Sequence, residues 1–161
     1  MIDHSTSLEQ VRDYPRPPRL EFCNDSILVK ALGQILAETN HSQRVLETFH
    51  PPTYYLPAEA INDKLLQPAS GRSFCEWKGF ANYFDVIFAD QIIPRAIWAY
   101  PHPTEAFSSL AGWFALYPRL MDGCWVNDEL VIPQPGGFYG GWITSQVCGP
   151  FKGDPAHPEL I

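Results

Sequence analysis

Proline is the feature of this sequence that most constrains its fold. The chain contains 16 prolines, about double the usual proportion, and they are spread along its length instead of forming one tract. An internal proline removes a backbone donor and clashes with the preceding helical turn, so a chain punctuated this often cannot hold many long helices. The sequence therefore predicts a mainly β fold of short strands and turns.

Alternation of apolar and polar residues predicts where several strands lie. Residues 26–31 and 34–39 flank a Leu-Gly dipeptide, which favours a hairpin with glycine in the turn. Residues 92–100 predict another strand, and Pro94 within it indicates an edge position or a bulge. We expect one or two short helices, over residues 58–66 and 104–110, to interrupt the strands.

The length of 161 residues corresponds to one domain that can bury a core without metal or disulfide support. Residues 1–18 end in a proline-rich run and predict a flexible N-terminal arm. Residues 19–153 predict the single globular β domain, and residues 154–161 a C-terminal tail.

Charge and cysteine spacing exclude several classes of function. The net charge is −7 and no Lys/Arg cluster occurs, which argues against binding to nucleic acid. No apolar run approaches the roughly 20 residues of a membrane span, and the N-terminus lacks the pattern of a signal peptide. The four cysteines form no C-x-x-C pair and the histidines form no ligand pattern, so we expect neither a metal site nor a cofactor. A cytoplasmic location with reduced thiols follows.

Cys75 and Lys78 are the candidate catalytic residues, because they place a thiol and an amine among four aromatic rings in the segment 73–83. A cationic neighbour favours the thiolate form of cysteine and would make Cys75 a nucleophile. The alternative is that Cys75 is a small buried side chain and that Lys78 extends its amine into water. The pattern leaves both interpretations open.

Arg44 and Glu47 are candidate ligand-binding residues. In a helical turn they would be neighbours, and Glu47 would orient an arginine that binds a carboxylate or phosphate. The alternative is a structural ion pair. His50, which precedes two prolines, is more typical of a loop histidine than of a general base, because no orienting partner is evident nearby.

Four aromatic residues complete the predicted pocket: Tyr55, Tyr83, Trp98 and Tyr100. Rings with polar tips can line a pocket and orient a ligand by hydrogen bonds, and Trp98 and Tyr100 share one strand face. The alternative is that these rings only cover the core.

Five segments taken together resemble a widespread bacterial family of unknown function. They are 44–47, 50–57, 75–79 with Tyr83, 98–101 and 113–117. The segments 138–142 and 149–153 are similar to a long-tailed cyanobacterial form. The resemblance spans residues 19 to 153 and implies a compact fold of coiled antiparallel β-sheets of the Mss4-like class. Members are sometimes labelled nucleotidyltransferase-like, but this chain has no Asp-x-Asp pair and no phosphate-binding glycine loop.

Two hypotheses of function remain. The first is a small-molecule-binding domain or an enzyme, with an aromatic pocket that carries Cys75 and Lys78. The second is a non-catalytic module that binds a protein partner or forms a homodimer through Phe138–Trp142, because aromatic enrichment with few charges also suits an interface.

Overall fold

The computed structural model describes residues 8–160, and these fold mainly as β-structure. The strands are β1 (Glu9–Gln10), β2 (Arg19–Cys23), β3 (Ile27–Ala31), β4 (Gln34–Thr39), β5 (Ser42–Leu46), β6 (Thr53–Tyr55), β7 (Leu66–Cys75), β8 (Gly79–Phe88), β9 (Gln91–Ala99), β10 (Phe114–Leu116), β11 (Gly123–Val126), β12 (Glu129–Leu130), β13 (Ile132–Pro133), β14 (Trp142–Ile143) and β15 (Val147–Cys148). Short 3-10 helices connect them: η2 (Val11–Asp13), η3 (Ala58–Ala60), η4 (Asp63–Leu65), η5 (Glu105–Leu110) and η6 (Pro118–Leu120). The predicted mainly β fold is confirmed.

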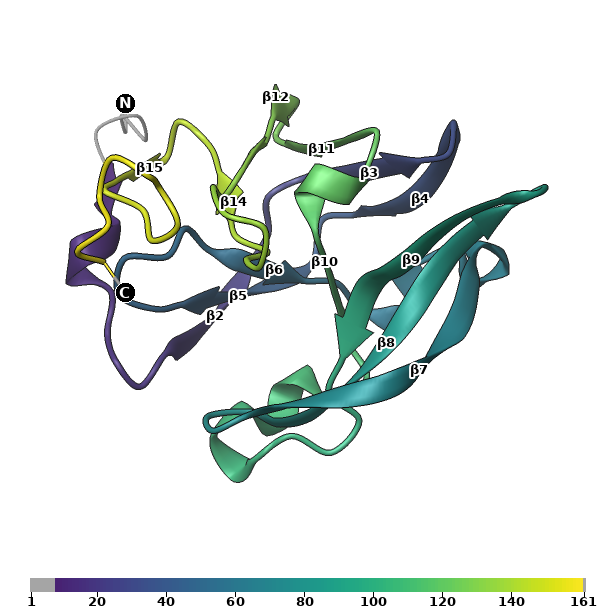
Figure 1. Ribbon diagram of the computed structural model, residues 1–161, viewed down its shortest axis with the longest axis horizontal. Helices are drawn as coiled ribbons and strands as arrows, with labels where there is room; N and C mark the ends of the chain where they lie inside the picture. The colour runs from purple at the N-terminus through teal and green to yellow at the C-terminus, as the bar shows by residue number, and fades with distance from the viewer. Residues whose placement is uncertain (1–7, 161) are drawn as a thin grey trace.

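The structure contains two four-stranded antiparallel sheets, in the strand orders β12-β11-β3-β4 and β10-β9-β8-β7. The three-stranded sheet β2-β5-β6 runs between them (Figure 1). Its strand β6 continues into a bridge between Leu56 and Phe114, which links the middle sheet to the second large sheet.

The main core fills the space between these sheets. Each side chain buried there contributes roughly 1.5–3 kcal/mol relative to an exposed one. Its largest fully buried members are Ile27, Leu36, Tyr54, Leu56, Ile97, Leu116 and Trp142. Both four-stranded sheets and strand β6 supply side chains to this cluster, and the alternation seen in the sequence marks the faces that are buried.

The predicted hairpin and the predicted bulge are both present. Leu32 and Gly33 have φ angles of 50° and 74° in the turn between β3 and β4, the backbone region that glycine adopts without strain. In β9 the register against β8 shifts next to Pro94, where the backbone N–H of Arg95 donates to the Asp85 carboxylate (2.8 Å). Pro94 has no N–H to donate to β8, so the pairing of the two strands is interrupted here. The next N–H, that of Arg95, is satisfied by the Asp85 side chain instead of by a strand partner.

The single helix predicted over residues 58–66 is wrong. The segment forms the 3-10 helices η3 and η4, separated by Ile61, which is extended and forms a bridge with Ala37. The Asn62 side chain accepts a hydrogen bond from the Lys64 N–H (3.3 Å) and so caps the N-terminus of η4 as a separate helix. Ile61 and Leu65 are buried in either conformation, which is why their spacing alone does not specify an α-helix.

The short helix predicted at 104–110 is present as η5, a 3-10 helix interrupted at Phe107. Thr104 does not cap it with its side chain; its hydroxyl donates instead to the Trp77 carbonyl (2.6 Å) and holds η5 against the turn between β7 and β8. None of the helices within residues 8–160 is long and apolar enough to cross a membrane.

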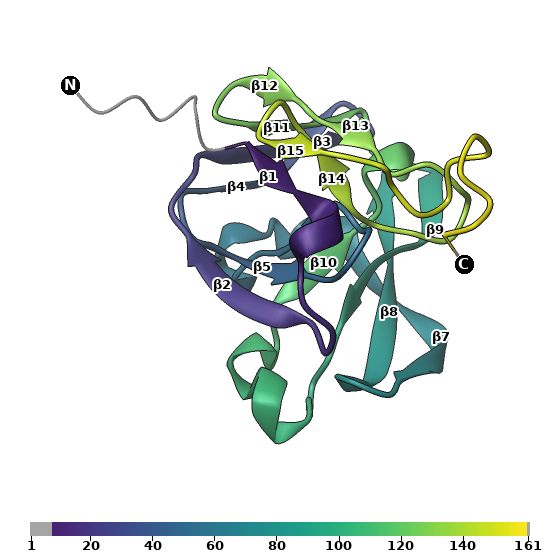
Figure 2. The same cartoon turned by 90° about the vertical axis from the view of Figure 1, so that its left-hand side faces the viewer.

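The first described residues pack against the end of the chain. Strand β1 pairs in parallel with β15 (Figure 2), and Val11 is fully buried beside Leu46 and Val147. Residues 1–7 of the predicted arm lie outside the described residues. The boundaries drawn at residues 18 and 153 remain a prediction.

Trp142 belongs to the core, where its ring lies 4.7 Å from that of Tyr54 and none of it is exposed. We expect Trp142→Ala to lower the free energy of unfolding by about 4 kcal/mol in urea titrations. Phe138→Ala, at a position that is 85% exposed, should change it by less than about 0.5 kcal/mol. A change of oligomeric state with unchanged stability in Trp142→Ala would place this ring in an interface instead.

Candidate functional site

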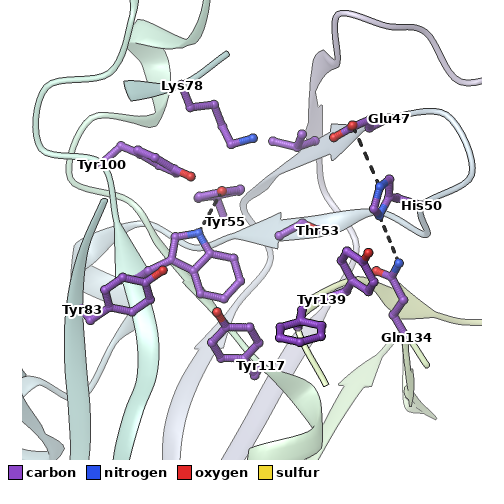
Figure 3. Close-up of a pocket in the computed structure, with 14 residues that line it drawn as sticks. Glu47, His50, Thr53, Tyr55, Lys78, Tyr83, Tyr100, Tyr117, Gln134 and Tyr139 are labelled. Carbon is purple, nitrogen blue, oxygen red and sulfur yellow. Dashed lines mark hydrogen bonds and ion pairs between the residues drawn. The ribbon is translucent and has the colours of Figure 1, made fainter. Parts of the chain in front are cut away.

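A cavity of about 220 Å³ lies where β5, β6, β8 and β9 meet the loop 134–141 (Figure 3). Its lining comes from segments far apart in the sequence: Val45, Glu47, His50, Thr53, Tyr55, Lys78, Tyr83, Trp98, Tyr100, Tyr117, Gln134, Phe138, Tyr139 and Gly140. The cavity is smaller than the sites that hold drug-sized ligands, so its volume suits a compound of about one ring.

Tyrosine side chains form much of the wall. The Tyr55 hydroxyl on β6 accepts a hydrogen bond from the indole N–H of Trp98 on β9 (3.2 Å). Burial raises the pKa of Tyr55 and of Tyr100 above the ordinary range, and raises the pKa of Tyr117 to about 12. The phenols therefore stay uncharged at neutral pH and offer ring faces and hydroxyls to a planar molecule.

Lys78 enters the cavity from the tight turn between β7 and β8, where its backbone N–H donates to the Cys75 carbonyl (3.2 Å). The residue is only 8% exposed, and its amine lies 5.8 Å from the ring centre of Tyr100 and 5.7 Å from that of Phe107. Among the residues that the structure describes, no carboxylate forms an ion pair with this amine. The faces of these two rings are the contacts that the structure gives for the amine.

The opposite wall contains a chain of polar side chains. The Gln134 amide nitrogen lies 3.0 Å from His50 Nδ1, and His50 Nε2 lies 3.9 Å from the Glu47 carboxylate. The same carboxylate pairs with Arg16 at 3.2 Å. Burial lowers the pKa of His50, so the imidazole is neutral at pH 7. The ring of Tyr139 packs edge-on against this imidazole, with centroids 5.3 Å apart.

Six of the predicted site residues line this one cavity. They are Glu47, Tyr55, Lys78, Tyr83, Trp98 and Tyr100. The last four come from the hairpin β7–β8 and its neighbour β9, so the strands bring them together across their paired register. Their role in binding remains a prediction.

Cys75 lies outside this cavity. It lines an adjoining, more open hollow of about 710 Å³, together with Trp77, Tyr100, Phe138 and others. Its thiol lies beside the Tyr100 hydroxyl, and the side chain packs in the aromatic cluster around that ring. Tyr100 lines both hollows, whereas Lys78 lines only the inner cavity and Cys75 only the outer one, so the structure does not bring Cys75 and Lys78 together as a direct pair in one cavity.

Arg44 does not line the cavity, and the predicted pairing of Arg44 with Glu47 is wrong. Arg44 lies in strand β5 and Glu47 directly follows that strand, and along an extended chain the side chains of residues three apart point to opposite faces. Arg44 is 4% exposed and binds Glu9 through two nitrogens (3.0 and 3.2 Å), and its Nε donates to Glu21 (3.0 Å). Burial alone would lower the pKa of Arg44, but its hydrogen bonds to Glu9 and Glu21 outweigh burial and raise that pKa. Arg44 forms a structural ion pair, but its partners are Glu9 of β1 and Glu21 of β2.

This ion pair should stabilise the fold, because it ties β5 to β1 and β2. We expect Arg44→Met to lower the free energy of unfolding by about 2 kcal/mol, the value of charged hydrogen bonds to partly exposed carboxylates. Arg12→Met, a change at an exposed arginine, is the matched control and should stay within about 0.5 kcal/mol. Equal stability of the two variants in urea would contradict the role given to Arg44.

Sequence reasoning missed several residues of the cavity: Thr53, Tyr117, Gln134, Phe138, Tyr139 and Gly140. Most of them come from the loop 134–141, whose aromatics were favoured for an interface and left out of the predicted pocket. Gly140 and Gly141 allow close packing, since a Cβ at the first would meet Trp98 and at the second Gln134 and Pro51. The paired glycines are the signal that could have placed this loop against the sheet.

The thiols should differ strongly in reactivity. Burial raises the pKa of Cys124, which is 1% exposed, whereas Cys75 reaches the open hollow. We expect iodoacetamide to modify Cys75 at least tenfold faster than Cys124 in the native protein, measured by peptide mass spectrometry over time. The two rates should converge in urea. Equal rates in the native protein would show that Cys75 is as inaccessible as Cys124.

Fold and cavity together define a small β domain with a tyrosine-lined pocket. Residues 19–127 match the family model described as "Domain of unknown function (DUF427)", and the chain belongs to this family because the match covers more than half of it. The family resemblance seen in the sequence is confirmed. The described residues hold no group of three His, Cys, Asp or Glu side chains placed to bind a metal ion. Gln134, Phe138 and Tyr139 lie beyond the matched residues.

Proposed function

We propose that this protein binds a small planar molecule with an anionic group, and that the group is held by Lys78. The observation that carries the proposal is the Lys78 side chain, which is 8% exposed, points its amine into the cavity (Figure 3) and has no carboxylate partner among the described residues. A buried ion is costly unless it is paired, and proteins retain such an ion where a ligand completes the pair.

The aromatic neighbours of Lys78 support a charged amine. Contacts with the faces of Tyr100 and Phe107 are worth roughly 0.5–2 kcal/mol, less than the cost of removing an ammonium from water. A carboxylate or phosphate would supply the remaining stabilisation by a charge-assisted hydrogen bond. The same rings would pack against the planar part of the ligand.

Cys75 is not part of the proposed anion site. Because it lines the outer hollow and not the inner cavity, the ligand contact falls to Lys78, and Cys75 would meet only a ligand that extends outward past Tyr100. The free cysteines Cys23, Cys75, Cys124 and Cys148 support placing this function in a reducing compartment such as the cytoplasm.

Replacement of Lys78 separates binding from folding. We expect Lys78→Met to weaken binding of benzoate or phenyl phosphate at least tenfold, measured by isothermal titration calorimetry. The same variant should be as stable as the parent, or more stable by about 1 kcal/mol, because an apolar side chain replaces an unpaired buried charge. A structural lysine would instead lose stability when replaced.

Lys64→Met is the control, since Lys64 is exposed and outside the cavity. It should bind both anions like the parent. Native mass spectrometry of freshly purified protein, read beside the denatured mass, would identify the physiological ligand. Anion binding that is equal in the parent and in Lys78→Met would contradict the proposal.

A further inference from the structure

The orientation of the Gln134 amide is fixed by two backbone groups. Its Oε1 accepts from the Gly141 N–H (3.1 Å), and its Nε2 donates to the Lys152 carbonyl (2.9 Å). A backbone N–H can only donate and a carbonyl can only accept, so rotating the amide by 180° would break both bonds. Gln134 is 3% exposed, and water cannot compensate for that loss.

This orientation determines which nitrogen of His50 carries the proton. The second hydrogen of Gln134 Nε2 points to His50 Nδ1 (3.0 Å), so Nδ1 must accept and is unprotonated. In the neutral ring the proton is then on Nε2, which faces Glu47 on the cavity wall (Figure 3). Gln134 is thus a positioning residue that acts on a ligand through His50.

The Nε2–H of His50 has no close acceptor in the described structure. Glu47 is 3.9 Å away, beyond hydrogen-bond distance, and its carboxylate oxygen already receives the Arg16 guanidinium. The cavity wall therefore presents the His50 Nε2–H donor and the Glu47 carboxylate acceptor side by side, and these two groups do not form a hydrogen bond with each other. A hydroxyl group matches this pair, because its oxygen accepts from Nε2–H while its hydrogen is donated to the carboxylate.

We infer that the ligand of this cavity is a planar hydroxy acid, whose acid group binds Lys78 and whose hydroxyl binds between His50 and Glu47. The inference rests on the function proposed above and adds the second polar group of the ligand. Phenolic acids of one ring have both groups and a planar body, and they suit a cavity of about 220 Å³ with tyrosine walls.

The test compares benzoate with 3-hydroxybenzoate and 4-hydroxybenzoate by isothermal titration calorimetry. We expect at least one hydroxybenzoate to bind tenfold or more tightly than benzoate. His50→Phe should abolish this preference while benzoate still binds. His50→Gln should restore part of the preference, because its amide nitrogen can replace the Nε2–H donor.

Gln134→Glu tests the assigned proton position. A carboxylate beside Nδ1 would require a proton there, so the neutral ring would lose its Nε2–H and the preference for the hydroxyl would fall. In ¹⁵N NMR spectra of the parent, we expect His50 Nδ1 in the unprotonated range and Nε2 in the protonated range. Gln91→Glu adds the same charge at an exposed position and should leave both readouts unchanged.

The outcomes distinguish the proposed anion site at Lys78 from the proposed hydroxy-acid ligand. If benzoate binds through Lys78 but neither hydroxybenzoate is preferred, the hydroxy acid is refuted and the anion site stands. If His50 proves to be protonated at Nδ1 in the parent, the role of Gln134 is refuted. If none of the three anions binds, both the anion site and the hydroxy acid are refuted.

Discussion

The pocket depends on the alternation of side chains along β6. This strand of three residues sends Tyr54 into the main core, against Trp142, and sends Tyr55 to the opposite face, against Trp98 and Tyr100. One short strand therefore separates a close-packed interior from a polar cavity. Because both tyrosines are almost fully buried, a shift of β6 by one residue would exchange the faces of all its side chains and break the contacts of both rings.

Sequence reasoning identified the parts of the pocket that local patterns encode. Lys78, Tyr83, Trp98 and Tyr100 lie in or beside one antiparallel hairpin unit, so proximity in the chain becomes proximity in space. It could not identify the partner of His50, because Gln134 lies 84 residues further along the chain. No periodicity or spacing encodes a contact of that kind between a loop and a strand end.

Arg44 shows a second limit of predicting side-chain contacts from the sequence. Its neighbour Glu47 has the right charge and spacing, but strand geometry turns the two side chains apart, and the actual partners come from β1 and β2. Helix and strand place residues three apart in opposite ways, so a charge pair can be predicted only after the element is known. The errors at 58–66 have this origin too, because an apolar spacing was assigned to a helix that the chain does not form.

The loop that closes the pocket relies on residues without side chains. A Cβ at position 141 would occupy the space of the Gln134 carbonyl oxygen, whose bond to the Gly141 N–H keeps the amide in place. The proton on the imidazole is therefore set, through two hydrogen bonds, by a residue that has no chemistry of its own. In the binding proposed above, a substitution at Gly141, which does not line the cavity, would change the polar groups that the cavity presents.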